Sequence, residues 1–245
     1  LKCKEHAHQT EISNRTYKVQ IDPVVGSVHL ITDEQIEIYP ELTIHGQPAS
    51  LSCTGVKKLT DDGSTLSYCL DYTVTTDNLS LNVKWTIKCR SYFNAIESNV
   101  QIHNSKAANH EGGLWDLGDS SSVFIDDFGI CIHKGTQQPS IMIDERHIEP
   151  ENSLRLIQHG SGGDNWQSTS HVLADGLVPI KNQGYELLVD DALSSGKRAR
   201  PKLKINNNIQ VVLEQFWQNF PSAITVDSTQ TKIELLAKTH YQHEL

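Results

Sequence analysis

Three segments of this chain combine a tryptophan with side chains that bind hydroxyl groups or move protons. They are residues 112–124 (GGLWDLGDSSSVF), 158–171 (QHGSGGDNWQSTSH) and 214–221 (EQFWQNFP), and they hold three of the four tryptophans in 245 residues. An indole ring can stack on the apolar face of a sugar, while carboxylates and amides exchange hydrogen bonds with its hydroxyl groups. If the segments meet in space, they predict a carbohydrate-binding cleft.

The first segment has the composition of a rigid loop. Gly112 and Gly113 permit backbone conformations closed to other residues, or the close approach of a ligand. Asp116 and Asp119 can accept hydrogen bonds from backbone N–H groups and hold the loop in shape. Trp115 would then form one wall of a sugar cleft; the alternative is a structural turn with Trp115 packed into the core.

The other two segments also combine a tryptophan with polar side chains. Small polar residues surround Trp166, with His159 and His171 at the ends of that segment. A histidine has an ordinary pKa of about 6.5, so it can accept a proton near neutral pH. A surface loop seldom carries a tryptophan without a use, although a plain long loop is the alternative. Around Trp217, phenylalanines and amides such as Asn219 fit either a core or a mixed polar lining.

Alternation of apolar and polar residues runs through the rest of the chain. In 80–90 one face holds Leu81, Val83, Trp85, Ile87 and Cys89, a period of two that indicates a half-buried antiparallel strand. The other strand-like runs are 15–22, 26–32, 34–40, 41–46, 64–74, 95–103, 122–133, 153–159, 184–190, 201–208, 209–217 and 231–237. Helical periodicity is almost absent, which predicts an all-β fold, a large antiparallel β-sandwich (supersandwich-like).

The predicted domain layout is one central β-sandwich domain over 15–245, preceded by a segment, 1–14, that is disordered or derived from cloning. Two smaller β domains meeting near residue 150 are the alternative. The net charge of −9 argues against a nucleic-acid surface, which needs a surplus of Lys and Arg. The one basic cluster, 196–204, has a solvated strand end as its plainer interpretation. No apolar run approaches the roughly 20 residues that cross a bilayer.

Cysteines and histidines give no metal motif. The five cysteines (Cys3, Cys53, Cys69, Cys89, Cys131) contain no CxxC pair, and four of them resemble small buried apolar residues in strands. Their number leaves the compartment open, with a secreted or periplasmic location preferred. The twelve histidines form no HExxH motif, so we predict no metal or other cofactor, although carboxylate oxygens leave calcium open.

Several separated motifs carry a family resemblance. ANHEGGLWDLGDSSSVFIDD (108–127), QHGSGGDNWQSTSHV (158–172), GYEL (184–187), GKRARP (196–201) and FWQNFPSAI (216–224) resemble, in this order, the middle domain of YetA-like bacterial proteins and fungal exo-acting rhamnogalacturonan lyases. The resemblance covers residue 15 to the end. It implies a larger protein with an N-terminal β-barrel and a C-terminal α/α toroid, so the flanking domains of the same polypeptide are expected partners. Relatives would continue beyond His243-Glu244-Leu245 into a Gly-, Gln-, Glu- and Lys-rich motif.

The resemblance implies β-elimination in a polysaccharide that contains galacturonic acid. A base removes the C5 proton, and a positive or amide group neutralises the uronate carboxylate so that this proton becomes acidic. The candidate bases are His171, then His110, and His159. The candidate substrate-binding residues are Trp115, Asp116, Asp119, Gln158, Asp164, Asn165, Trp166, Arg198, Arg200, Trp217 and Asn219.

Other classes of protein remain open at this point. A glycosidase needs two carboxyl groups roughly 5 to 9.5 Å apart, for which Asp164 with Asp119 is a better pair than Asp116 with Asp119. GSGGD is not the GxSxG elbow of a serine hydrolase. A noncatalytic carbohydrate-binding or scaffolding domain explains the tryptophans and amides without any base.

Overall fold

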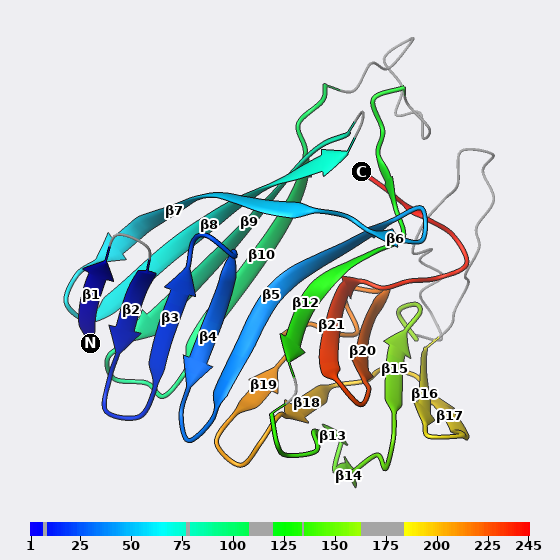
Figure 1. Cartoon of the computed structure of the whole chain (residues 1–245). Coiled ribbons are helices and arrows are strands. Elements are labelled where there is room, and N and C mark those ends of the chain that lie inside the picture. The colour runs from blue at the N-terminus through cyan, green and yellow to red at the C-terminus, as the bar shows by residue number, and fades with distance from the viewer. Residues whose placement is uncertain (7–8, 77–78, 108–119, 134, 163–183) are drawn as a thin grey trace. The chain divides into compact units, whose positions relative to one another are not determined.

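The computed structural model describes residues 1–6, 9–76, 79–107, 120–133, 135–162 and 184–245 (Figure 1). Within these ranges all regular structure is β-strand, and the strand registers are antiparallel. The prediction of an all-β, antiparallel sandwich is therefore confirmed. No helix in this part of the chain is long and apolar enough to cross a membrane.

Two compact units make up the chain. Unit 1 comprises residues 1–40, 48–107 and 245, and unit 2 comprises residues 41–47 and 108–244. Strand β5 (Gln35–Ile44) passes from unit 1 into unit 2, and the short β6 (Gln47–Pro48) pairs with it. Each unit has its own buried side chains, and β5 contributes to a sheet in both.

Unit 1 is a two-sheet sandwich. The first sheet has the order β1 (Lys2–His6), β2 (Gln9–Ser13), β3 (Lys18–Asp22), β4 (Ser27–Ile31), β5, and the second the order β10 (Ile96–Asn104), β9 (Leu79–Arg90), β8 (Thr65–Thr76), β7 (Leu51–Asp61). Tyrosines of β8 link the two sheets: Tyr72 donates to the Gly26 carbonyl at 2.8 Å, and Tyr68 donates to Glu5 at 2.8 Å.

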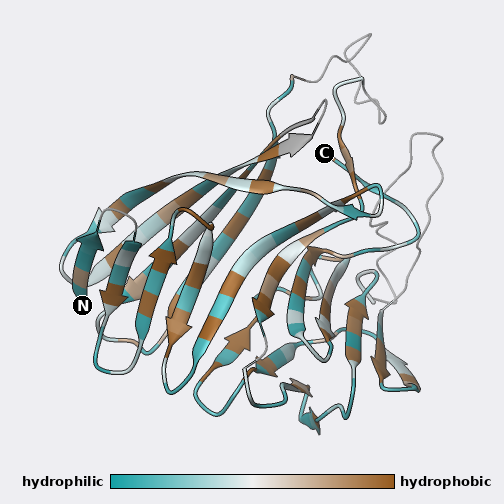
Figure 2. Cartoon of the chain, viewed as in Figure 1, coloured by the Kyte–Doolittle hydropathy of each residue, from teal (hydrophilic) through white to brown (hydrophobic). Residues whose placement is uncertain are grey.

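The alternation in 80–90 buries the side chains it predicted. All five apolar residues of that face of β9 are at most 2% exposed, Trp85 among them. The Trp85 indole N–H donates to the Ser98 hydroxyl at 2.8 Å, which satisfies its one polar atom. Hydrophobic and hydrophilic residues alternate in the same way along the long strands in Figure 2.

The N-terminal segment differs from its prediction. Instead of being disordered, residues 2–6 and 9–13 form β1 and β2, which pair with each other, and β2 continues the pairing with β3. Ile12 is fully buried, and the Cys3 sulfur lies 3.1 Å from the Tyr68 hydroxyl. The polar composition of 1–14 hid this order, because a strand with one exposed face needs few apolar residues.

Unit 2 holds three sheets. The largest has the order β5, β12 (Asp127–His133), β21 (Gln230–Leu236), β20 (Ser222–Val226), β15 (Leu154–Gln158), β16 (Tyr185–Val189), β17 (Ala192–Gly196). The second has the order β14 (Arg146–Ile148), β13 (Ser140–Ile143), β18 (Pro201–Lys204), β19 (Gln210–Val212), and β11 (Phe124–Ile125) pairs with β22 (His243–Glu244). Buried apolar side chains of both larger sheets form the core: Leu154, Leu156, Ile224, Ile141, Ile143 and Leu203.

Strand boundaries differ from the sequence prediction at two places. The runs 34–40 and 41–46 are one continuous strand, β5, because Pro40 is accommodated inside it. Residues 222–226, which carry no clear strand pattern, form the central strand β20 between β21 and β15. Four of its five residues are buried, the polar Ser222 among them, so no alternation of apolar and polar residues marks it.

Thiol reactivity should follow burial. Cys69, Cys89 and Cys131 are buried, whereas Cys3 and Cys53 are half-buried. Burial raises the pKa of Cys89 to about 11 and also raises the pKa values of Cys69 and Cys53, which lowers the fraction of reactive thiolate. We expect iodoacetamide at pH 8 to modify Cys3 first and the three buried thiols only in denaturant, as followed by intact mass. Equal modification rates at all five would contradict this arrangement.

Candidate functional site

The structure describes part of the predicted site. Its described members are Gln158, His159, Arg198, Arg200, Trp217 and Asn219, all in unit 2. The remaining predicted residues lie outside the described ranges: His110, Trp115, Asp116, Asp119, Asp164, Asn165, Trp166 and His171. The site is therefore built from the first group.

Gln158 is a buried connection at the end of β15. Its side chain is fully buried, and its Nε2 donates to the carbonyls of Gly160 at 2.6 Å and Lys197 at 2.9 Å. Its Oε1 accepts from the Ala199 backbone N–H at 2.9 Å. Gln158 thus holds the backbone on both sides of Arg198, and in this structure it positions that residue.

Arg198 connects two of the three tryptophan segments. Its Nε donates to the Ser161 carbonyl at 3.0 Å, and its guanidinium carbon lies 4.3 Å from the centroid of the Trp217 ring. A guanidinium over an indole is held by cation–π attraction of about 0.5–2 kcal/mol. Arg198 is exposed, and neither terminal nitrogen of its guanidinium bonds to any described residue. The two NH₂ groups are therefore available to a carboxylate, which they can grip with two hydrogen bonds.

The indole of Trp217 is half-buried and follows the buried Phe216. A tight turn presents this pair, since Gln215 has a φ of 57° and its carbonyl accepts from the N–H groups of Gln218 and Asn219. The Ser222 hydroxyl donates to the Phe216 carbonyl and fixes the following chain. Core packing of Phe216 therefore leaves Trp217 at the edge of the unit, where the guanidinium reaches it.

His159 lies on the other side of the sheet. Gln158 and Ile157 are successive strand residues with opposite side-chain directions, and Ile157 pairs with Glu186. The His159 Nε2 lies 3.2 Å from the Glu186 carboxylate without hydrogen-bond geometry to it, and this nitrogen is buried. The structure thus brings Gln158, Arg198 and Trp217 together, and the His159 side chain lies on the face of the sheet opposite that of Gln158.

Arg200 and Asn219 are both exposed at the surface of unit 2. Neither side chain has a hydrogen bond to a described residue, and the Asn219 backbone N–H donates to the Gln215 carbonyl. Their substrate-binding roles stay predictions.

Two clusters of buried charge are absent from the sequence prediction. Arg155 of β15 forms two hydrogen bonds to Glu234 of β21, at 2.5 and 3.1 Å, and Thr225 of β20 donates to the same carboxylate at 2.8 Å. Lys232 of β21 bonds to Asp127 and Glu41. Arg155, Thr225 and Lys232 stand in register across three strands, on the face opposite Leu156 and Ile224. In the sequence, these clusters are indicated only by the charged residues of 230–236, which alternate with Thr231 and Ile233.

These clusters have closed hydrogen-bond networks. The Glu234 carboxylate also accepts from the Lys238 backbone N–H. Burial raises the pKa of Glu234, but the hydrogen bonds and the charge of Arg155 outweigh burial and hold this pKa below the ordinary range. His243, 1% exposed, lies 2.8 Å from the Ala237 carbonyl through Nε2, and burial lowers its pKa. We interpret both clusters as structural. Among the described residues no group of three His, Cys, Asp or Glu could hold a metal ion.

No protein-family model matches this chain, and no curated protein sequence matches it either.

Proposed function

We propose that this chain is a carbohydrate-active domain of a polysaccharide lyase that cleaves uronate-containing, rhamnogalacturonan-like glycans by β-elimination. The observation that supports this proposal is the arrangement of Arg198: an exposed residue whose guanidinium stacks on Trp217, whose backbone is held by Gln158, and whose two terminal nitrogens have no hydrogen-bond partner among the described residues. A β-elimination needs such a group, because a neutralised carboxylate makes the neighbouring C5 proton acidic.

The roles follow from chemistry. Arg198 binds the uronate carboxylate, the half-buried Trp217 supports the guanidinium and contacts the sugar, and Gln158 positions the arginine. The base is a histidine, with His171 first and His110 second. His159 fits this role less well, because its Nε2 is buried against Glu186.

A noncatalytic carbohydrate-binding domain is the second candidate. The buried Nε2 of His159 favours it, since His159 is the one candidate base among the described residues and this nitrogen is inaccessible. In that case the chain binds acidic glycan and another part of the polypeptide carries out any chemistry.

The test uses the full-length protein with rhamnogalacturonan and other uronate polymers, with the absorbance of the unsaturated product as the readout. Arg198→Leu should lower product formation by about 10²-fold or more, because one charge-stabilising donor group is lost. Arg146→Leu, which removes another exposed arginine of unit 2, is the matched control and should leave the rate unchanged.

Separate outcomes distinguish the two candidates. Product that disappears in His171→Ala or His110→Ala supports catalysis. Binding of the polymer without product, weakened by Arg198→Leu, supports the noncatalytic domain. If the protein neither binds nor cleaves any uronate polymer, both candidate functions are excluded.

A further inference from the structure

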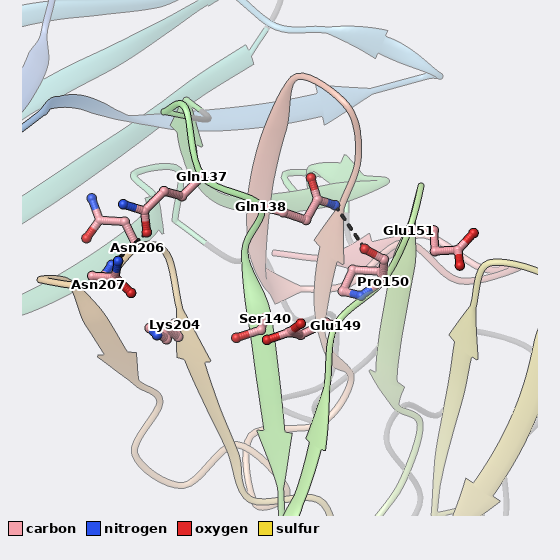
Figure 3. A pocket seen from close by; sticks show the side chains of 9 residues that line it. All are labelled: Gln137, Gln138, Ser140, Glu149, Pro150, Glu151, Lys204, Asn206 and Asn207. Atoms are coloured by element: carbon pink, nitrogen blue, oxygen red, sulfur yellow. Dashed lines mark hydrogen bonds between the residues drawn. The ribbon is translucent and has the colours of Figure 1, made fainter.

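A polar hollow lies in the second sheet of unit 2. Its volume is about 390 Å³, and it lies at the ends of β13 and β18, where Ser140 pairs with Lys204 in register (Figure 3). This volume falls within the roughly 300–1,000 Å³ of small-molecule sites. In Figure 3, Lys204 and Asn206 come from the β18 side, and Ser140 and Glu149 lie close together opposite them.

The walls of the hollow are fixed by hydrogen bonds to the backbone. The Asn206 Oδ1 accepts from the N–H groups of Asn208 and Ile209 at 2.9 and 2.8 Å. The Gln137 Oε1 accepts from the Asn207 N–H at 3.0 Å, and the Gln138 Nε2 donates to the Pro150 carbonyl at 3.3 Å, drawn dashed in Figure 3. Because these amides are already anchored, a ligand would meet a preorganised surface.

Three donor groups of this lining have no partner among the described residues. The Asn206 side chain is only 4% exposed, yet its Nδ2 donates to none of them. The Nε2 of the half-buried Gln137 and the ammonium of the exposed Lys204 also donate to no described residue. These donors face no described acceptor, so the oxygens of a ligand can accept hydrogen bonds from them.

We propose that this hollow binds a neutral saccharide unit. Hydroxyl oxygens accept from Asn206, Gln137 and Lys204, and a hydroxyl hydrogen donates to Glu149. The lining includes no aromatic or aliphatic side chain besides Pro150, which disfavours an apolar ligand. Its two glutamates outnumber its single lysine, which disfavours an acidic one. The proposal does not depend on Arg198 or on lyase activity.

The test titrates the chain with the methyl glycosides of glucose, galactose and rhamnose, and with methyl galacturonoside, by saturation-transfer NMR and calorimetry. Lys204→Met should weaken binding of the best neutral glycoside by roughly tenfold, the value of one hydrogen bond from a charged donor. Lys202→Met is the matched control, since Lys202 is also exposed on β18, two residues away, and does not line the hollow. It should leave binding unchanged.

Three results would overturn the proposal: no binding of any neutral glycoside, equal binding in wild type and Lys204→Met, or tighter Lys204-dependent binding of the acidic glycoside. Arg198→Leu should leave neutral-glycoside binding intact. A failure at this hollow is thereby distinguished from a failure of the uronate site.

Discussion

Arg155→Met is expected to lower the free energy of unfolding by about 3 kcal/mol at neutral pH, because it leaves the buried carboxylate of Glu234 without its cationic partner. Glu234 is 3% exposed and takes two hydrogen bonds from Arg155. This value is the lower end of the destabilisation usually caused by removing one partner of a buried ion pair. The lower end applies because the Arg155 side chain is 33% exposed and partly screened by water. Urea unfolding followed by circular dichroism measures the change.

The pH dependence separates this cause from lost packing. In wild type, Arg155 outweighs burial and holds the Glu234 pKa below 4.5, so the pair stabilises the fold above pH 4.5 and this contribution is lost as the pH falls further. In Arg155→Met, only the hydrogen bonds from Thr225 and from the Lys238 N–H still oppose burial, so the pKa of Glu234 should be higher than in wild type. The deficit of the variant should therefore shrink toward acidic pH. Adding Glu234→Gln should recover part of the loss; a deficit independent of pH and of Glu234→Gln would refute the mechanism.

Gly129→Ala is expected to cost more than about 4 kcal/mol, or to prevent folding. A Cβ at this position would lie 2.3 Å from the Ile233 carbonyl oxygen and 3.0 Å from the Glu234 Cα, both in the backbone of the adjacent strand β21. The register between β12 and β21 shifts between Phe128 and Gly129, so the strands come close there. The yield of folded protein and the urea midpoint are the measurements.

Gly55→Ala is the matched control for this glycine. Gly55 also lies in a strand beside a register shift, but a Cβ there would meet nothing within 4 Å. We expect a change within about 0.5 kcal/mol. Equal stability of the two alanine variants would mean that β12 and β21 are not spaced as described.

The candidate site was only partly predictable from sequence. The composition of 214–221 singled out Trp217, and the family resemblance implied Arg198 as a site residue, but their contact depends on two turns brought together by the sheet. Gln158 was predicted to bind substrate, whereas in the structure two of its three side-chain hydrogen bonds hold the backbone on either side of Arg198 and the third goes to the Gly160 carbonyl. The side of the sheet that His159 occupies followed from strand parity, once the β15–β16 register was known.

The sequence by itself determined that the chain is all β and which face of β9 is buried. A period of two is a local property of a strand, so the alternation alone predicts the burial of Leu81, Val83 and Trp85, without knowledge of any distant residue. Only the tertiary structure decided that Arg155 meets Glu234, 79 residues away, and that Arg198 meets Ser161, 37 residues away. Strand order and register bring such partners together, and both are set by packing of the whole sheet.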